Sequence, residues 1–210
     1  MNRIARMFLL LALSLLTTAL FAQEDFSADI VNHNQGKDAA PGKMYVTKDK
    51  LRFEGQDKGG HGGGAVIINM ATQTSDVVMA ERKMYLEFPQ GQGPGAQRTW
   101  SFFRARDIDN ACSDWQKLAT NHGGTCKKIG SETVNGRSTV KYEATNQNGE
   151  TSYIWLDPKI AFPIKWEGKN GGGELQNIKE GSQPSSLFEI PSDYQKMQMP
   201  AGMPNMQRPQ

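Results

Sequence analysis

The chain of 210 residues has little of the side-chain chemistry that most enzymes use. It contains two cysteines and three histidines, and the histidines, His33, His61 and His122, stand in unrelated sequence contexts. The G-x-S-x-G, H-E-x-x-H and G-x-x-x-x-G-K-[ST] patterns are all missing from the sequence. These gaps exclude the motif-defined serine hydrolases, zincins and P-loop nucleotide-binding enzymes. We therefore predict a protein that is not an enzyme and has no cofactor.

Long apolar runs are also scarce, and only one occurs, from Met7 to Phe21. Arg3 and Arg6 precede it, and the small residue Ala22 follows it. This order is typical of a secretory signal peptide, and the run is shorter than the roughly 20 apolar residues of a membrane-spanning helix. We predict that residues 1–22 are removed. The mature protein is then soluble and periplasmic, with secretion as the alternative, and has no integral membrane segment.

Neither sign of charge dominates the chain. The 24 basic and 22 acidic residues become equal in number once Arg3 and Arg6 are removed with the signal peptide. Proteins that bind nucleic acids carry a basic patch or stripe. No nucleic-acid partner is therefore expected.

The two cysteines, Cys112 and Cys126, both follow the predicted signal peptide. An even number of cysteines in an oxidising compartment predicts a disulfide. Closing a loop of about 15 residues contributes roughly 3 kcal/mol in the chain-entropy model. Two free thiols are the alternative, and a metal pair is disfavoured because no nearby histidine completes a zinc-like spacing.

Alternating apolar and polar residues recur along the chain from Phe26 onward. This period of two predicts strands with one solvated face, and the short connections predict antiparallel hairpins. Apolar residues recur at helical spacing between Asp107 and Asn121, where Asp107 or Asp109 caps the start. We predict about eleven strands, the last over Ser186–Ile190, and one clear helix.

Domain organisation follows from where this pattern stops. Residues 23–194 are expected to form one β-rich domain of ordinary globular composition. Residues 195–210, QKMQMPAGMPNMQRPQ, have no periodicity and are expected to be disordered. Thioethers are soft ligands that suit Cu(I), so a Cu(I) site in this tail is one alternative function. Its ligands would be Met197, Met199, Met203 and Met206.

The predicted sheet carries more aromatic side chains than one helix covers. Sites for apolar molecules are concave and mostly hydrophobic, with a few polar groups. We therefore predict ligand-binding side chains on a concave face of the sheet, with Arg52 meeting an anionic end of the ligand. The other members of this predicted site are Phe53, Tyr85, Trp155 and Trp166. An ordinary packed core is the alternative interpretation of the same aromatic residues.

Four segments in a fixed order resemble a known family. They are GKMYVTKDKLRFEG (42–55), AVIINMATQTSDVVMAERKMYLEF (65–88), IWLDPKIAFPIKWE (154–167) and SLFEIPSDYQKM (186–197). Together they resemble the periplasmic LolA-like lipoprotein-carrier superfamily, and in particular its uncharacterised relatives, over most of residues 26–197. The resemblance implies a mainly β fold, an unclosed antiparallel half-barrel of about eleven strands with one or two covering helices. It also implies that the concave face holds acyl chains or another lipid.

The sequence departs from the carriers in its single strong helix, its cysteine pair and its glycine-rich loops at residues 55–64 and 89–97. The resemblance is therefore used to predict the fold of this chain, and it is not used to predict a lipoprotein cargo. We expect a non-enzymatic periplasmic protein that binds an apolar ligand, a lipid or acyl chain, in the half-barrel. A Cu(I)-binding protein and a protein-interaction module with exposed strand edges are the alternatives.

Overall fold

The computed structural model describes residues 25–34, 37–38, 41–55, 64–89, 107–118 and 124–198. The predicted signal peptide, most of both glycine-rich loops, and Met199, Met203 and Met206 lie outside these residues. No helix within the described ranges is long and apolar enough to cross a membrane.

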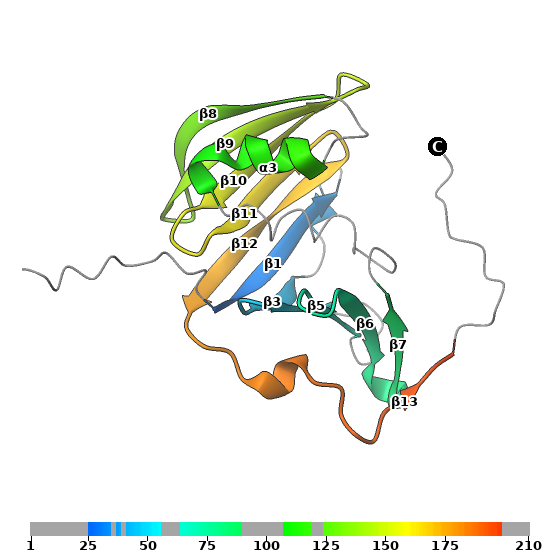
Figure 1. The fold of residues 1–210 in the computed structure, drawn as a ribbon. Helices are drawn as coiled ribbons and strands as arrows, with labels where there is room; N and C mark the ends of the chain where they lie inside the picture. Colours follow the sequence, from blue (N-terminus) through cyan, green and yellow to red (C-terminus); the bar gives the residue numbers. More distant parts are fainter. Residues whose placement is uncertain are drawn as a thin grey trace, which may run out of the picture.

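The described strands form one sheet that does not close on itself (Figure 1). Its order is β13-β7-β6-β5-β4-β3-β1-β12-β11-β10-β9-β8, with β2 beside β1. The bounds are β1 Phe26–Asn34, β2 Lys37–Asp38, β3 Gly42–Val46, β4 Lys50–Glu54, β5 Ala65–Asn69, β6 Thr74–Met79, β7 Met84–Phe88, β8 Gly124–Val134, β9 Arg137–Asn146, β10 Thr151–Asp157, β11 Phe162–Gly168, β12 Gly171–Glu180 and β13 Gln195–Lys196. Eleven of these strands have five or more residues, as predicted. The mainly β, unclosed half-barrel is therefore confirmed.

Tight turns set the antiparallel pairing of the carboxyl-terminal strands. Asn135 and Gly136 join β8 to β9 with φ angles of 48° and 77°. Positive φ at both central residues is the type I′ turn, and Asn-Gly is its preferred sequence. The Asn135 side chain also donates from Nδ2 to the backbone oxygen of Leu175 on β12, at 3.1 Å. This contact holds the β8–β9 turn close to β12, so the sheet is curled.

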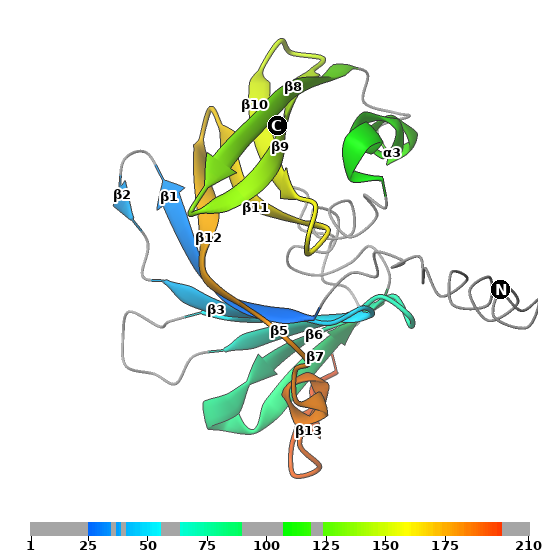
Figure 2. The same ribbon diagram turned by 90° about the vertical axis from the view of Figure 1, so that its left-hand side faces the viewer.

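The sheet bends where β1 meets β12. The register of this pair shifts between Ser27 and Asp29, and Asn177 on β12 has a φ of 51°. A bulge of this kind bends a strand and increases its twist. Figure 2 shows the amino-terminal half (β1–β7) and the carboxyl-terminal half (β8–β12) as two parts of one curved sheet, with α3 on its concave side.

The predicted helix is confirmed over its first part. A short 3-10 helix, η1 (Ala80–Arg82), joins β6 to β7, and a second, η2 (Ile108–Asn110), continues into the α-helix α3 (Ala111–Leu118). Asp107 caps η2, because its side chain accepts a hydrogen bond from the backbone N–H of Asp109 at 3.1 Å. Residues 119–123 lie outside the described ranges.

The predicted disulfide between Cys112 and Cys126 is confirmed, with Cα atoms 5.5 Å apart. It links α3 to the edge strand β8. Tyr142 on β9 is 2% exposed and donates from its hydroxyl to the backbone oxygen of Ile108, at 2.7 Å. Together these bonds fix the helix on one face of β8–β10. We call this face of the sheet the inner face and the opposite one the outer face.

A hydrophobic core joins the two halves of the sheet. Val46 and Leu51 from the amino-terminal half, and Leu175 from the carboxyl-terminal half, are 0% exposed and belong to one cluster. In the same cluster, the rings of Phe26 and Phe162 meet edge to face with centroids 5.2 Å apart. The two halves therefore share their largest buried cluster.

A segment after β12, residues 185–198, crosses the outer face of the amino-terminal half and ends at the edge of the sheet, and we call it the C-terminal strap (Figure 2). The prediction of a strand over Ser186–Ile190 is wrong, because this part forms the 3-10 helix η3 (Ser185–Phe188). Phe188 is 6% exposed and packs in a cluster with Ile67 of β5. Because η3 lies above the outer face, the ring of Phe188 packs down onto β5. A strand added at the edge of the sheet would not place the ring there.

The strap ends in β13. Its two residues, Gln195 and Lys196, pair in parallel with Met84 and Tyr85 of β7. Sheet pairing therefore extends past residue 194, where the sequence analysis ended the domain. Residues 199–210 lie outside the described ranges.

Candidate functional site

An unbroken row of apolar side chains crosses the inner face of the amino-terminal half. Residues that are directly opposite each other on neighbouring strands point to the same face of the sheet. Following these partners from strand to strand gives a row of side chains that runs from β1 to β7. The row, which we call the inner row, consists of Ala28, Met44, Phe53, Val66, Val77 and Leu86. Ala28 and Met44 are 3% and 2% exposed, whereas the other four are half-buried. The inner row therefore leaves the core at the bend and becomes accessible toward β7.

A second row on the same face runs beside it and is more deeply buried. Its members are Phe26, Val46, Leu51, Ile68, Ser75 and Phe88. Only Phe88, on β7, is half-buried, and the other five are buried. Neither row contains a charged side chain. On the inner face of this half, the second row is therefore mostly buried, whereas the inner row is partly accessible from β4 to β7.

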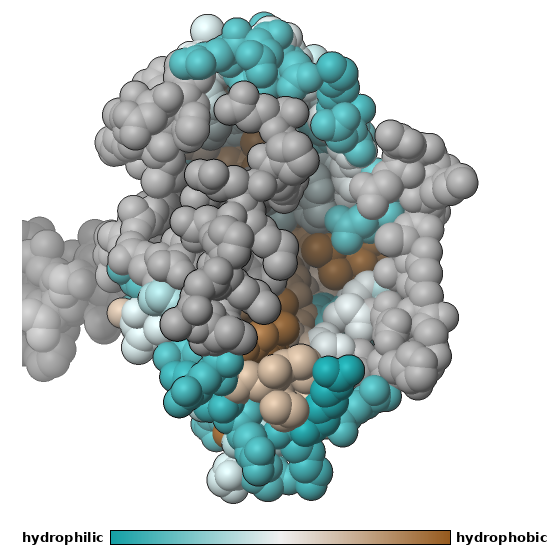
Figure 3. All heavy atoms as spheres, turned by 90° about the vertical axis from the view of Figure 1, so that its right-hand side faces the viewer, coloured by the Kyte–Doolittle hydropathy of each residue, from teal (hydrophilic) through white to brown (hydrophobic). Residues whose placement is uncertain are grey.

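The inner face continues across the bend as far as α3. Pairing runs from Asn32 on β1 through Gly173 on β12 to Trp166 on β11 and Ile154 on β10. Ile154 packs in the cluster under α3. Figure 1 looks onto this face, with α3 in front of the sheet, and Figure 3 shows from the side that apolar atoms gather in a hollow between more polar upper and lower parts.

The structure does not bring the five predicted site residues together. Phe53 and Trp166 lie on the inner face, and their contact with a ligand stays a prediction. Arg52, Tyr85 and Trp155 lie on the outer face, because side chains alternate along a strand. The five side chains of the predicted site are therefore divided between the two faces of the sheet.

Arg52 makes its hydrogen bonds on the outer face. Its Nε donates to Oε1 of Glu54 at 2.6 Å, and its Nη1 donates to the backbone oxygen of Leu187 at 2.9 Å. Leu187 belongs to the C-terminal strap. Arg52 therefore holds the strap and does not face the inner row, where the sequence analysis placed it beside an anionic end of a ligand.

Trp155 is a packed structural residue. It is 2% exposed, and its Nε1 donates to Oε2 of Glu132 at 2.6 Å. The ammonium nitrogens of Lys141 and Lys165 each lie 4.6 Å from its ring centre. Hydrogen bonds from Lys141 and then from Trp155 hold the pKa of the Glu132 carboxyl below its ordinary value. Trp155 therefore has the burial and the fixed partners of a packed residue.

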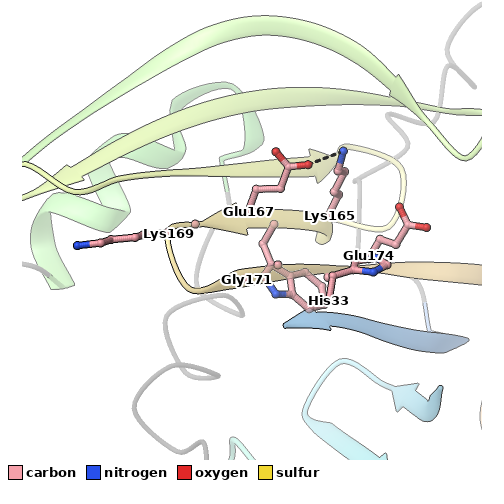
Figure 4. Close-up of a pocket in the computed structure, with 10 residues that line it drawn as sticks. His33, Lys165, Glu167, Lys169, Gly171 and Glu174 are labelled. Atoms are coloured by element: carbon pink, nitrogen blue, oxygen red, sulfur yellow. Dashed lines mark ion pairs between the residues drawn. The ribbon is translucent and has the colours of Figure 1, made fainter. Parts of the chain in front are cut away.

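A cavity of about 340 Å³ lies at the β11–β12 hairpin beside the end of β1 (Figure 4). Its polar wall includes Lys165 and Glu167, which form an ion pair at 2.8 Å, and Lys169, which pairs with Glu150 at 2.8 Å. Trp166, His33 and the three glycines Gly171–Gly173 also line it. Charged walls of this kind suit a polar molecule, so the inner row is the better match for an apolar ligand.

Sequence reasoning missed three half-buried members of the inner row, Val66, Val77 and Leu86. It selected aromatic side chains, and the segment AVIINM of β5 gave no alternation to follow. Ala65 and Ile67 of that strand are 4% and 3% exposed because the C-terminal strap covers them on the outer face. These positions could be identified only from the cross-strand register, which aligns them with Phe53.

No protein-family model matches the chain, and neither does any curated protein. Among solved structures, an uncharacterized conserved protein from Thermus thermophilus is 10% identical, with a TM-score of 0.54 over 84% of this chain and 91% of that one. A chain from the Pseudomonas aeruginosa MucA/MucB complex is 14% identical, with a TM-score of 0.53 over 85% of this chain and 60% of that one. A crystal structure of MucB is also 14% identical, with a TM-score of 0.50, and this chain spans 60% of its length.

These similarities concern the fold, since all three identities are below 15%. A LolA superfamily protein from Nitrosomonas europaea also matches, with 9% identity and a TM-score of 0.34, which is too low for a comparison of details. The open antiparallel half-barrel predicted from the sequence is confirmed. The Thermus thermophilus protein and MucB share this fold.

Proposed function

We propose that this protein is a non-enzymatic binding protein for an apolar ligand, an acyl chain or another lipid tail, held on the inner face of the half-barrel. The observation that supports it is the inner row, in which Phe53, Val66, Val77 and Leu86 stay half-buried on a face without charged neighbours in either row. Burial of apolar surface contributes about 25 cal/mol per Å². A ligand that covers this row therefore gains free energy from apolar surface that the described residues leave accessible.

The dimensions of the row fit a chain-like ligand. Neighbouring strands lie about 4.8 Å apart, so the accessible stretch from β4 to β7 extends for about 14 Å. Trp166 lies on the same face across the bend and extends the apolar surface toward α3. A ligand lying across the strands would contact side chains of both halves.

We place this function in the periplasm. The disulfide between Cys112 and Cys126 supports an oxidising compartment, where such bonds persist. The amino-terminal charged and apolar segment supports export, and the signal peptide over residues 1–22 stays a prediction.

Binding of a fluorescent fatty acid to the mature chain, residues 23–210, tests the proposal. We expect one saturable site, and Leu86→Lys should weaken the binding at least tenfold because it places a charge in the inner row. Ile129→Lys is the matched control, since Ile129 is 46% exposed on β8 and its replacement should leave binding unchanged. Circular dichroism and thermal melting establish that both variants are folded. No saturable uptake by folded wild-type protein would overturn the proposal.

A protein-interaction module is the second candidate. The observation that favours it is the complex of MucA and MucB, since MucB has a similar fold. A partner would then cover the inner row with its own apolar side chains. Under this alternative the fatty acid fails to bind, and Leu86→Lys instead abolishes co-purification of a protein from periplasmic extract.

A further inference from the structure

Asn32 is a polar residue on the inner face of β1. Side chains alternate along a strand, so Asn32 shares this face with Ala28 and Ile30. The Asn32 side chain is half-buried, and its carboxamide makes no hydrogen bond with the residues that the structure describes. A carboxamide offers two N–H donors and an acceptor oxygen. Because an unpaired polar group that loses water costs free energy, a ligand with a matching polar group would be stabilised beside it.

The indole edge of Trp166 lies next to Asn32. Gly173 on β12 is directly opposite Asn32 on β1 and Trp166 on β11. A Cβ at Gly173 would lie 2.8 Å from Cε2 of Trp166, the atom bonded to Nε1, and 2.7 Å from the backbone oxygen of Val31 on β1. Directly opposite residues have Cβ atoms about 4.5–5.5 Å apart, so Cε2 lies within about 8 Å of the Cβ of Asn32. The glycine thus lets the ring reach across β12 toward β1.

The two side chains present neutral hydrogen-bonding groups at one place. The indole N–H of Trp166 has no acceptor among the described residues. An oxygen atom about 3 Å from each group would accept from the indole N–H and also bond the Asn32 carboxamide. Ile30 and Leu175, directly opposite each other on the same face, are the apolar neighbours of this pair.

We propose that Asn32 and Trp166 bind the polar end of the ligand, and that this end is uncharged and carries oxygen, as in a monoacylglycerol. This inference rests on the proposed function, in which the inner row binds the tail. An ionised carboxylate finds no cationic side chain among the described neighbours of Asn32 on this face, and burying an uncompensated charge is costly. A hydroxyl or ester oxygen avoids that cost. Asn32 and Trp166 take the role that the sequence analysis gave to Arg52, for a ligand of different charge.

The separation between this polar pair and the inner row fits a chain-like ligand. Asn32 is four residues beyond Ala28, about 13 Å along β1. Phe53, where the accessible stretch of the inner row begins, lies on β4, two strands and about 10 Å from β1. The polar end and the start of that stretch are therefore about 16 Å apart along the sheet. An extended acyl chain reaches both places, and a compact molecule does not.

Displacement of the fluorescent fatty acid from the mature chain by two competitors tests the proposal. Monolauroylglycerol and laurate carry the same acyl chain, and at pH 8 only laurate is charged. We expect monolauroylglycerol to compete at a concentration at least tenfold lower than laurate. Asn32→Leu should weaken monolauroylglycerol at least fivefold and leave laurate within twofold, because the laurate carboxylate stays in water. Asn32→Gln, which keeps a carboxamide, should retain part of the preference.

Trp166→Phe tests the second donor, because it removes the indole N–H and keeps an aromatic ring. It should also reduce the preference for monolauroylglycerol. Asn148→Leu is the matched control, since Asn148 is exposed in the turn between β9 and β10 and its replacement should leave the preference unchanged. Circular dichroism and thermal melting establish that each variant is folded.

The outcomes separate this inference from the proposed function. If both competitors displaced the fatty acid equally from the wild type, or if the preference survived Asn32→Leu, the polar site would be overturned while the apolar ligand site stands. The same holds if laurate competed better than monolauroylglycerol. If the wild type bound none of the three lipids, the proposed function would be overturned together with this site.

Discussion

Arg52 on β4 donates a hydrogen bond from Nη1 to the backbone carbonyl oxygen of Leu187, at 2.9 Å, and so joins two segments 135 residues apart in the chain. The side chain of Arg52 is 19% exposed, and Glu54 balances its charge. A charged donor to a partly buried carbonyl is among the stronger hydrogen bonds in proteins. The contact fixes the first part of the C-terminal strap on the outer face, from where the chain continues to β13 at the edge of the sheet.

Replacement of Arg52 by alanine tests this role. We expect Arg52→Ala to lower the free energy of unfolding by about 1.5–3 kcal/mol, the range for hydrogen bonds to charged groups. It should also accelerate proteolysis within residues 185–198, while fatty-acid binding persists because Arg52 lies on the outer face. Urea denaturation and limited proteolysis measure the two effects. Lys43→Ala, which removes an exposed ion pair with Asp29, should destabilise the fold much less, because solvent screens such pairs; an equal loss in both variants would contradict the role.

The strands and the disulfide could be predicted from the sequence, but the faces of the sheet could not. Alternation located β4 and β9, and the presence of two cysteines after the predicted signal peptide sufficed to predict the bond between Cys112 and Cys126. Arg52 and Phe53 are neighbours on β4, so alternation places them on opposite faces, but it does not say which of the two faces is the inner one. That depends on contacts such as Phe188 on Ile67, which are distant in sequence and leave no periodic pattern.

The disulfide should stabilise the fold as well as anchor α3. Cys112→Ser/Cys126→Ser removes a link between residues separated by 14 positions, and we expect it to lower the free energy of unfolding by about 2–4 kcal/mol. Urea denaturation of wild type and variant, each with and without reductant, measures this loss. Reductant should destabilise the wild type and leave the variant unchanged. A wild type insensitive to reductant would contradict the prediction.

Arg137 neutralises a buried carboxylate at the end of β9. Its Nε donates to Asp157, which is 2% exposed, and its Nη2 lies 2.7 Å from Oε1 of Glu180. Arg137→Ala leaves Asp157 without its countercharge, and breaking a buried pair costs about 3–5 kcal/mol. We expect a loss near the lower end of that range, since the backbone N–H of Lys159 still donates to Asp157 at 2.8 Å. Chemical denaturation at neutral pH provides the measurement.

The control for Arg137 uses the same acidic partner. Lys159 reaches Oε2 of Glu180 at 2.5 Å, but its side chain is 64% exposed. Exposed ion pairs contribute little to stability, so Lys159→Ala should change the free energy of unfolding only slightly. If Lys159→Ala were as destabilising as Arg137→Ala, the burial of Asp157 would not be the cause.

Asp76 on β6 gives the fold a dependence on pH. Its buried Oδ1 receives no hydrogen bond from the described residues. Burial raises the pKa of the Asp76 carboxyl above its ordinary value of 3.8, and Glu87, directly opposite on β7, raises it further. Between 3.8 and the raised pKa, the folded state binds more protons than the unfolded chain. The contribution of Asp76 to stability therefore falls as the pH rises through this window.

Asp76→Asn removes this cost. The variant should melt at a higher temperature than the wild type at pH 7, and the difference should shrink as the pH is lowered toward about 3, where the carboxyl is protonated in both states. Asp193→Asn is a control of opposite sign, because the hydrogen bond from Lys83 lowers the pKa of Asp193. Its variant should melt below the wild type at pH 7, and this difference should also disappear on acidification. Thermal melting across the pH range measures both differences. If both variants melted above the wild type at pH 7, or both below it, the opposite pKa shifts of Asp76 and Asp193 would be contradicted.

Gly173 on β12 allows Trp166 to lie across the sheet at the β11–β12 cavity. A Cβ at this position would lie 2.4 Å from Cζ2 of Trp166 and 2.7 Å from the backbone oxygen of Val31, so both the ring and β1 would have to move. We expect Gly173→Ala to lower the free energy of unfolding by about 1–3 kcal/mol, as overpacking does, and to shift the tryptophan emission.

At Gly168 in the same hairpin the nearest atoms would be 3.8 Å from a Cβ. Gly168→Ala should therefore be neutral or stabilising by up to about 1 kcal/mol, because alanine restricts the unfolded chain. Equal urea midpoints for the two variants would show that Trp166 does not require glycine beneath it.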